Sequence, residues 1–175
     1  MHSRLLRPLV LGAVLLLMGC SQRIIVCPVP AILADTASLT VFRPGTQPDL
    51  ANELYTVSLV GAQGDCVFNN KTSVVRSSID LSFRAVRAPS GEAATYTVPY
   101  FVVVQENAKI YAKRIYSLRF TFAPGAATAT VTQSPTVPEI RIENGKLPWN
   151  YQFLAGFQMT DAQIEYARKR TRYLP

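Results

Sequence analysis

Histidine is almost absent from this sequence of 175 residues, because the only one is His2. Cysteine occurs three times and tryptophan once. There is no glycine-rich phosphate-binding loop, no Gly-x-Ser-x-Gly turn and no cluster with metal-ligand spacing. The longest apolar run, residues 9–18, is shorter than the roughly 20 residues that a helix needs to cross a bilayer. These absences argue against phosphate-loop, serine-hydrolase and metal-dependent chemistry, and against a membrane-spanning helix.

The N-terminal segment has the parts of a secretory signal. Arg4 and Arg7 form a positive start, residues 9–18 form the apolar centre, and the small Gly19 directly precedes Cys20. The short apolar centre and its flanking residues favour a cleaved signal over a membrane-spanning helix. In one interpretation this is an ordinary signal peptide, and the cysteine at position 20 occurs there by chance.

Leu17-Met18-Gly19-Cys20 resembles the lipobox of bacterial lipoproteins, although a smaller residue is commoner at the position of Met18. The resemblance implies that residues 1–19 are removed as a signal peptide and that Cys20 is lipidated. Ser21 stands where lipoproteins of the inner membrane tend to carry Asp, which favours the outer membrane, with the inner membrane as the alternative. Two or more acyl chains hold a protein stably on a membrane. We therefore expect a lipid-anchored protein of the cell envelope that faces the periplasm.

Loss of the signal changes the composition of the chain. Removal of residues 1–19 leaves 156 residues, which suit a single domain. The formal charge falls from +7 to +5 with Arg4 and Arg7, and His2 is lost as well. A chain without histidine cannot use Ser-His-Asp or Cys-His catalysis or histidine-ligated metals. We expect no catalytic residue, no metal and no cofactor, and nucleic acid is not an expected partner in this compartment.

Two cysteines, Cys27 and Cys66, remain if Cys20 is lipidated. In an oxidising compartment they predict one disulfide; two unpaired buried thiols are the alternative, and a redox-active pair is disfavoured by the lack of Cys-x-x-Cys spacing. The bridge would close a loop of roughly 40 residues, worth about 4 kcal/mol in the chain-entropy model. Residues 20–36 are interpreted as a short lipidated tether, tied early to the body through Cys27.

From residue 37 onward, β-type segments alternate with turn residues. Residues 79–85 alternate apolar and polar side chains, and the apolar run 100–104 predicts a strand covered on both faces. Gly61 to Gly64 predict a hairpin turn, and Pro99 predicts a bulge or a strand start. The expected strands are residues 38–42, 54–60, 66–68, 73–86, 95–105, 109–122, 126–132, 139–143 and 151–159.

A different pattern ends the chain. Thr160 and Gln163 have the spacing of a capping box, which predicts a helix over about 161–172. Seven to nine short strands with one disulfide predict a mainly β, antiparallel, immunoglobulin-like β-sandwich with a short C-terminal helix. The single domain would span residues 37–175, and a partly open barrel is the alternative architecture.

Two features are candidate contacts for a ligand or partner. The basic residues Arg168, Lys169, Arg170 and Arg172 could contact anionic lipid or an acidic partner. The more favoured interpretation is a solvated helix end whose cations complement the helix dipole. Trp149 could stack on a ligand, and core packing is the equally weighted alternative. Eleven carboxylates form no tight motif, so a paired-carboxylate hydrolase would need residues that meet only in the fold.

The body is similar to an uncharacterised family of small bacterial lipoproteins. The similarity lies in Cys27-Pro28, Cys66, Pro99-Tyr100-Phe101-Val102 and Gly156-Phe157-Gln158-Met159-Thr160, and it implies no activity. The leading hypothesis is therefore a non-enzymatic module that binds an envelope protein or serves envelope assembly, with the membrane as a further partner through the lipid anchor. A β-sandwich that binds a glycan or another small ligand is second, and a carboxylate-dependent hydrolase is third.

Overall fold

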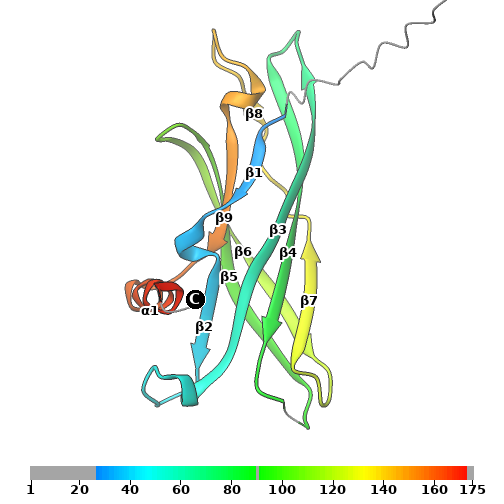
Figure 1. Ribbon diagram of the computed structural model, residues 1–175. Helices are drawn as coiled ribbons and strands as arrows, with labels where there is room; N and C mark the ends of the chain where they lie inside the picture. The colour runs from blue at the N-terminus through cyan, green and yellow to red at the C-terminus, as the bar shows by residue number, and fades with distance from the viewer. Residues whose placement is uncertain (1–26, 90, 173–175) are drawn as a thin grey trace, which may run out of the picture.

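The computed structural model describes residues 27–89 and 91–172, and in it two β-sheets face each other with one helix beside them (Figure 1). The first sheet has the strand order β1 (Val29–Ile32), β9 (Gln152–Phe157), β5 (Ala94–Glu106) and β6 (Lys109–Phe122). The second has the order β2 (Ser38–Phe42), β3 (Glu53–Asn69), β4 (Val74–Val86) and β7 (Thr128–Gln133), and β8 (Ile140–Arg141) pairs with β4. The predicted mainly β fold with two packed sheets is confirmed.

Strand β1 is the exception to the antiparallel pattern. It lies parallel to β9, from Val29 opposite Gln152 to Ile32 opposite Ala155. The short 3-10 helix η1 (Ala34–Thr36) follows it. Residues 29–36, which the sequence assigned to a tether, are thus part of the folded body. Pro30 is compatible with this strand because β1 lies at a sheet edge, where a missing N–H leaves no ladder bond unmade.

The hairpin predicted at Gly61 to Gly64 is wrong, because β3 runs without a turn through both residues. The register against β4 shifts between Leu59 and Gly61, so Val60 forms a bulge that bends the long strand. A Cβ on Gly64 would lie 3.0 Å from the carbonyl oxygen of Ser78 and 3.2 Å from Cγ of Pro30. Here glycine allows a close crossing of β1 over β3 rather than a turn.

The period-two pattern correctly identified the core face of β4, since Ile79, Leu81, Phe83 and Ala85 are all at most 2% exposed. The run 100–104 in β5 is buried on both faces, as predicted. Pro99 is neither a bulge nor a strand start. It lies within β5 just beyond the last β9 pair, Tyr100 opposite Phe157, and its carbonyl accepts from the N–H of Gln158 at 3.0 Å. The backbone N–H that a proline lacks would therefore point beyond the end of β9.

Helix α1 (Asp161–Arg172) has the predicted bounds and the predicted capping box. The Thr160 N–H donates to Oε1 of Gln163 at 2.9 Å, and the Gln163 N–H donates to Oγ1 of Thr160 at 3.3 Å. Tyr166 packs edge-on against Phe42 of β2 at 4.9 Å between ring centroids. In the part of the chain that the structure describes, no helix combines the length and apolarity required to cross a membrane.

Candidate functional site

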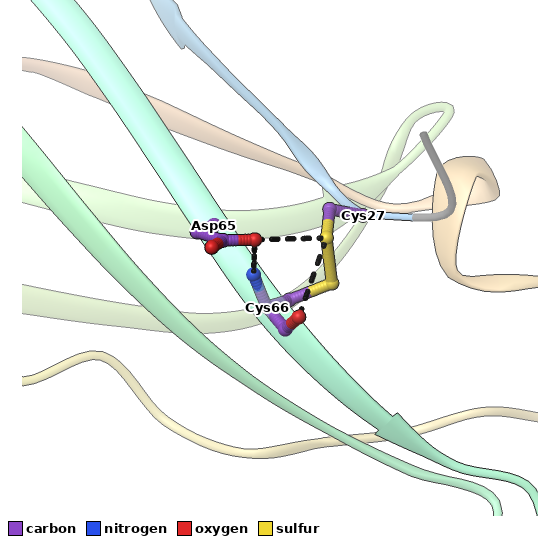
Figure 2. Close-up of a disulfide and its surroundings, with 3 residues drawn as sticks. All are labelled: Cys27, Asp65 and Cys66. Carbon is purple, nitrogen blue, oxygen red and sulfur yellow. Dashed lines mark hydrogen bonds between the residues drawn. A yellow bond between two sulfur atoms is a disulfide. The ribbon is translucent and has the colours of Figure 1, made fainter. Parts of the chain in front are cut away.

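The predicted disulfide between Cys27 and Cys66 is present and ties the start of the described chain to β3 (Figure 2). The Cys66 N–H donates to Oδ1 of Asp65 at 2.7 Å. Two contacts drawn in Figure 2 join Sγ of Cys27 to Oδ1 of Asp65 (3.9 Å) and to the Cys66 carbonyl (3.7 Å). A disulfide sulfur carries no proton, so these are close contacts rather than hydrogen bonds.

Three turns meet at the same end of the body as this disulfide. The Ile142 N–H donates to the carbonyl of Ser73, which joins the segment 142–151 to the β3–β4 turn. Lys146 reaches Glu106 at the β5–β6 turn at 2.7 Å. We call this region, made of the Cys27–Cys66 bridge, the turns at 70–73 and 107–108, and the segment 142–151, the disulfide end.

Five polar side chains fasten the disulfide end. The carboxylate of Glu143 accepts from Nζ of Lys109 at 2.7 Å, from the hydroxyl of Tyr111 at 2.9 Å and from Nζ of Lys146 at 3.0 Å. Lys146 thereby bridges Glu143 and Glu106. These hydrogen bonds lower the pKa of Glu143 to about 2, with Lys109 as the largest cause, and the bonds to Glu106 and Glu143 raise the pKa of Lys146.

Glu106 and Glu143 form a pair of carboxylates, which a hydrolase would need, since both contact the ammonium group of Lys146. A glycosidase requires one carboxyl group with a raised pKa that can donate a proton. The pKa of Glu143 is shifted in the opposite direction, and Lys146 stands between the two groups. The chemistry of this cluster is that of a clamp between two turns.

The clamp predicts a loss of stability in acid. The folded pKa of Glu143, about 2, lies below its ordinary value of 4.5. Its contribution is therefore present above the ordinary pKa and disappears as the pH falls from about 5 towards 2. We expect the urea midpoint of the wild-type protein to fall more steeply over this range than that of Glu143→Gln.

The control for this prediction is Glu139→Gln, which removes an exposed carboxylate that is paired with Arg76. That variant should keep the wild-type slope of urea midpoint against pH. Parallel curves for wild type and Glu143→Gln would show that the clamp does not contribute to the acid dependence.

Trp149 lies in this same end, on the 3-10 turn η3 (Pro148–Asn150) just before β9. Its side chain is 47% exposed, and the neighbouring Leu147 is 43% exposed. Pro148 between them is fully buried. The core-packing interpretation of Trp149 is therefore wrong, because the buried proline turns both neighbours outward.

A groove of about 610 Å³ lies beside α1. Its apolar wall includes Phe42, Pro48 and Tyr166, and its rim includes Ala162, Lys169 and Arg170. The hydroxyl of Tyr166 donates to Oε1 of Glu53 at 2.9 Å; burial, then this contact, raises the pKa of Tyr166. The hydrogen bond thus holds the ring of Tyr166 in place at the groove.

The basic residues of α1 are not simply a solvated helix end. Arg168 pairs with Asp35 of η1 at 2.5 Å, and Arg170 pairs with Glu53 of β3. Lys169 pairs with Glu165 on its own helix at 2.7 Å, and both side chains are 68% exposed. Two of the predicted contact residues therefore dock the helix, and Lys169 remains accessible at the groove. The side chain of Arg172 lies outside the described ones.

The remaining comparisons between sequence and structure concern the lipid anchor, metal binding and the groove. Cys20 and residues 1–19 lie outside the described residues. Among the residues that are described, no three His, Cys, Asp or Glu side chains come together as a metal-binding group. The groove was missed by the sequence analysis, because Phe42 and Tyr166 are far apart in the chain; the only available signal was the aromatic residue in a helix otherwise rich in charge.

Comparison with protein-family models, with curated proteins and with solved structures found no match to this chain.

Proposed function

We propose that this protein is a lipid-anchored module of the cell envelope that binds a segment of another envelope protein in the groove beside α1. The observation that carries the proposal is the position of this groove relative to the disulfide. Phe42 at the groove pairs with Glu53 at the start of β3, and Cys66 lies thirteen residues further along the same strand. At about 3.3 Å per residue, roughly 40 Å separate the two. A groove so far from the anchored end is accessible to a partner.

The groove suits a segment that presents an apolar side chain next to acidic residues. Phe42, Pro48 and Tyr166 supply apolar contact area, and aromatic side chains are enriched where proteins bind one another. Lys169 borders the groove, and its exposed ammonium is paired with the equally exposed Glu165, whereas Arg168 and Arg170 are paired with Asp35 and Glu53. Lys169 can exchange this exposed partner for a carboxylate of an acidic segment, and binding should then become weaker as salt increases.

The groove is tested with a photo-crosslinking amino acid at Ala162 in cells that produce the full chain. We expect a discrete adduct with one envelope protein, and a weaker adduct when Lys169→Glu is added, since Lys169 lines the groove and pairs with an exposed carboxylate of its own helix. The matched control is the same crosslinker at Ala93, an exposed alanine in the β4–β5 connection. Equal patterns at 162 and 93, or an adduct insensitive to Lys169→Glu, would refute the groove as the binding site.

The anchor is tested separately with Cys20→Ala. Metabolic labelling with an alkyne fatty acid should mark the wild-type protein and not the variant, and the variant should lose its acyl-dependent membrane association. Labelling should persist in the double variant Cys27→Ala/Cys66→Ala, which controls for the other two cysteines. A Cys20→Ala protein that is fully processed and still membrane-bound would contradict the lipoprotein proposal.

Outer-membrane rather than inner-membrane location is part of the same proposal, and it rests on Ser21 after the lipidated cysteine. The finer fold proposal is an immunoglobulin-like sandwich. It is supported by two facing sheets of mostly antiparallel strands, to which the N-terminal segment contributes β1 and β2, one in each sheet. The order β2-β3-β4-β7 differs from the A-B-E-D order of immunoglobulin domains, and sandwiches share the architecture without always sharing the topology.

A further inference from the structure

Exposed apolar side chains gather at the disulfide end. The structure has ten large hydrophobic residues with high exposure in the described part of the chain. Five of them belong to the disulfide end or lie directly beside it: Val29, Val67, Ile110, Leu147 and Trp149. Single exposed apolar residues are ordinary, whereas several at one end of a domain indicate a surface that is covered in use.

Trp149 and Leu147 are held rigidly at this end. The N–H of Leu147 donates to Oδ1 of Asn150 at 2.8 Å, and the N–H of Asn150 donates to the carbonyl of Leu147 at 2.9 Å. With Pro148 buried between them, the two side chains project from a fixed turn. Tryptophan is enriched where proteins meet the headgroup region of a bilayer, because its ring is apolar and its N–H is polar.

The chain that leads to the lipid reaches only this end. Cys27 lies seven positions after Cys20, and a fully extended chain covers at most about 25 Å over that distance. The seventeen residues of β3 run roughly 55 Å along the body. Because β1 and β9 are parallel and start side by side at Val29 and Gln152, the exit of the chain and Trp149 belong to the same end.

Charge does not oppose contact with a membrane here. Glu106 and Glu143 are paired with Lys146 and Lys109, and the exposed Glu139 is paired with Arg76. Lys71 in the β3–β4 turn and Arg141 of β8 are exposed and form no ion pair within the described part of the chain. Asp65 beside the bridge is an exposed carboxylate without an ion pair among the described residues, but Lys71 and Arg141 outnumber it, so little repulsion toward anionic headgroups remains.

We propose that the disulfide end lies against the bilayer and that Trp149, with Leu147, enters the headgroup region beside the acyl chains of Cys20. The inference rests on the lipidation proposed above. It makes the body stand on the membrane with its α1 groove turned away from it, and it assigns to Trp149 a bilayer contact in place of a sugar or peptide ligand.

Trp149 reports on this contact directly because it is the only tryptophan of the chain. The full-length acylated protein is reconstituted in vesicles of phosphatidylethanolamine and phosphatidylglycerol, and flotation establishes first that it is bound. We expect a blue shift of the Trp149 emission, quenching by lipids brominated near the headgroups, and a drop of about two-fold or more in quenching by iodide, since the exposed part of the ring leaves water.

The matched control moves the probe to another part of the body. In Trp149→Phe/Ala93→Trp the tryptophan sits in the exposed β4–β5 connection, and it should keep the same iodide quenching with and without vesicles. Failure to float would contradict the lipidation, not the orientation. Flotation with unchanged Trp149 emission would overturn the proposed contact, and equal protection of positions 149 and 93 would overturn the upright orientation.

Discussion

Replacing both Cys27 and Cys66 by alanine lowers the free energy of unfolding by about 4 kcal/mol, because the bridge closes a long loop and so restricts the unfolded chain. The two cysteines are 39 positions apart in sequence. For a body of this size, each kcal/mol shifts the melting temperature by about 2 to 4 °C, so we expect a decrease of roughly 8 to 16 °C. Thermal unfolding followed by circular dichroism measures it.

The native state gives a second reason for a large effect. Among the described residues, the four-residue strand β1 pairs with β9 alone, so the bridge is the covalent link that fastens this edge of one sheet to β3 of the other. The wild-type protein unfolded in the presence of a reducing agent is the control, and it should match the double variant. Coincident unfolding curves for oxidised and reduced wild type would show that the bridge does not stabilise the fold.

Local patterns predicted the parts of this fold that depend on neighbours in sequence. The alternation in β4 identified its buried face, and the spacing of Thr160 and Gln163 identified the start of α1 within one residue. Both signals are local, because each depends on residues a few positions apart within one strand or at one end of a helix. The disulfide was predictable for another reason, since the lipobox resemblance of Cys20 left Cys27 and Cys66 to pair with each other.

Contacts between distant segments explain what the sequence did not predict. Gly61 and Gly64 look like a turn, but a Cβ on Gly64 would press against Pro30 and the carbonyl of Ser78, so the close approach of β1 favours glycine there. The parallel pairing of β1 with β9 joins residues more than 120 positions apart, and no local pattern encodes it. The groove beside α1 depends in the same way on Phe42 meeting Tyr166.

These long-range contacts also connect the two proposed surfaces. Residues 27–36 link the disulfide to η1, and Asp35 of η1 pairs with Arg168 of the helix that borders the groove. The side chain of Thr36 lies against Gly156, where a Cβ would come within 2.0 Å of its Oγ1. The segment fastened by the bridge and the groove are thus joined by direct side-chain contacts, so in the proposed membrane orientation a partner bound at α1 would be held at a defined height above the bilayer.

Phe157→Ala is expected to lower the free energy of unfolding by about 3 to 5 kcal/mol, as large-to-small changes at buried aromatic residues do. Phe157 in β9 is fully buried, and its ring centroid lies 5.9 Å from that of Phe83 in the opposite sheet. No strand of one sheet pairs with a strand of the other among the described residues. Side-chain contacts such as this one therefore hold the two sheets together, and urea unfolding measures the loss.

Three further variants make this prediction specific to the interface between the sheets. Ile115→Ala removes an apolar side chain that is 60% exposed on β6, and its effect should stay within about 0.5 kcal/mol. Phe157→Leu keeps most of the volume, and its loss of about 1.5 kcal/mol or less remains measurable if Phe157→Ala does not fold. Because Phe83 and Phe157 are in contact, the double variant Phe83→Ala/Phe157→Leu should lose less than the sum of the single changes. Strict additivity would mean that the two sheets are held together elsewhere in the core.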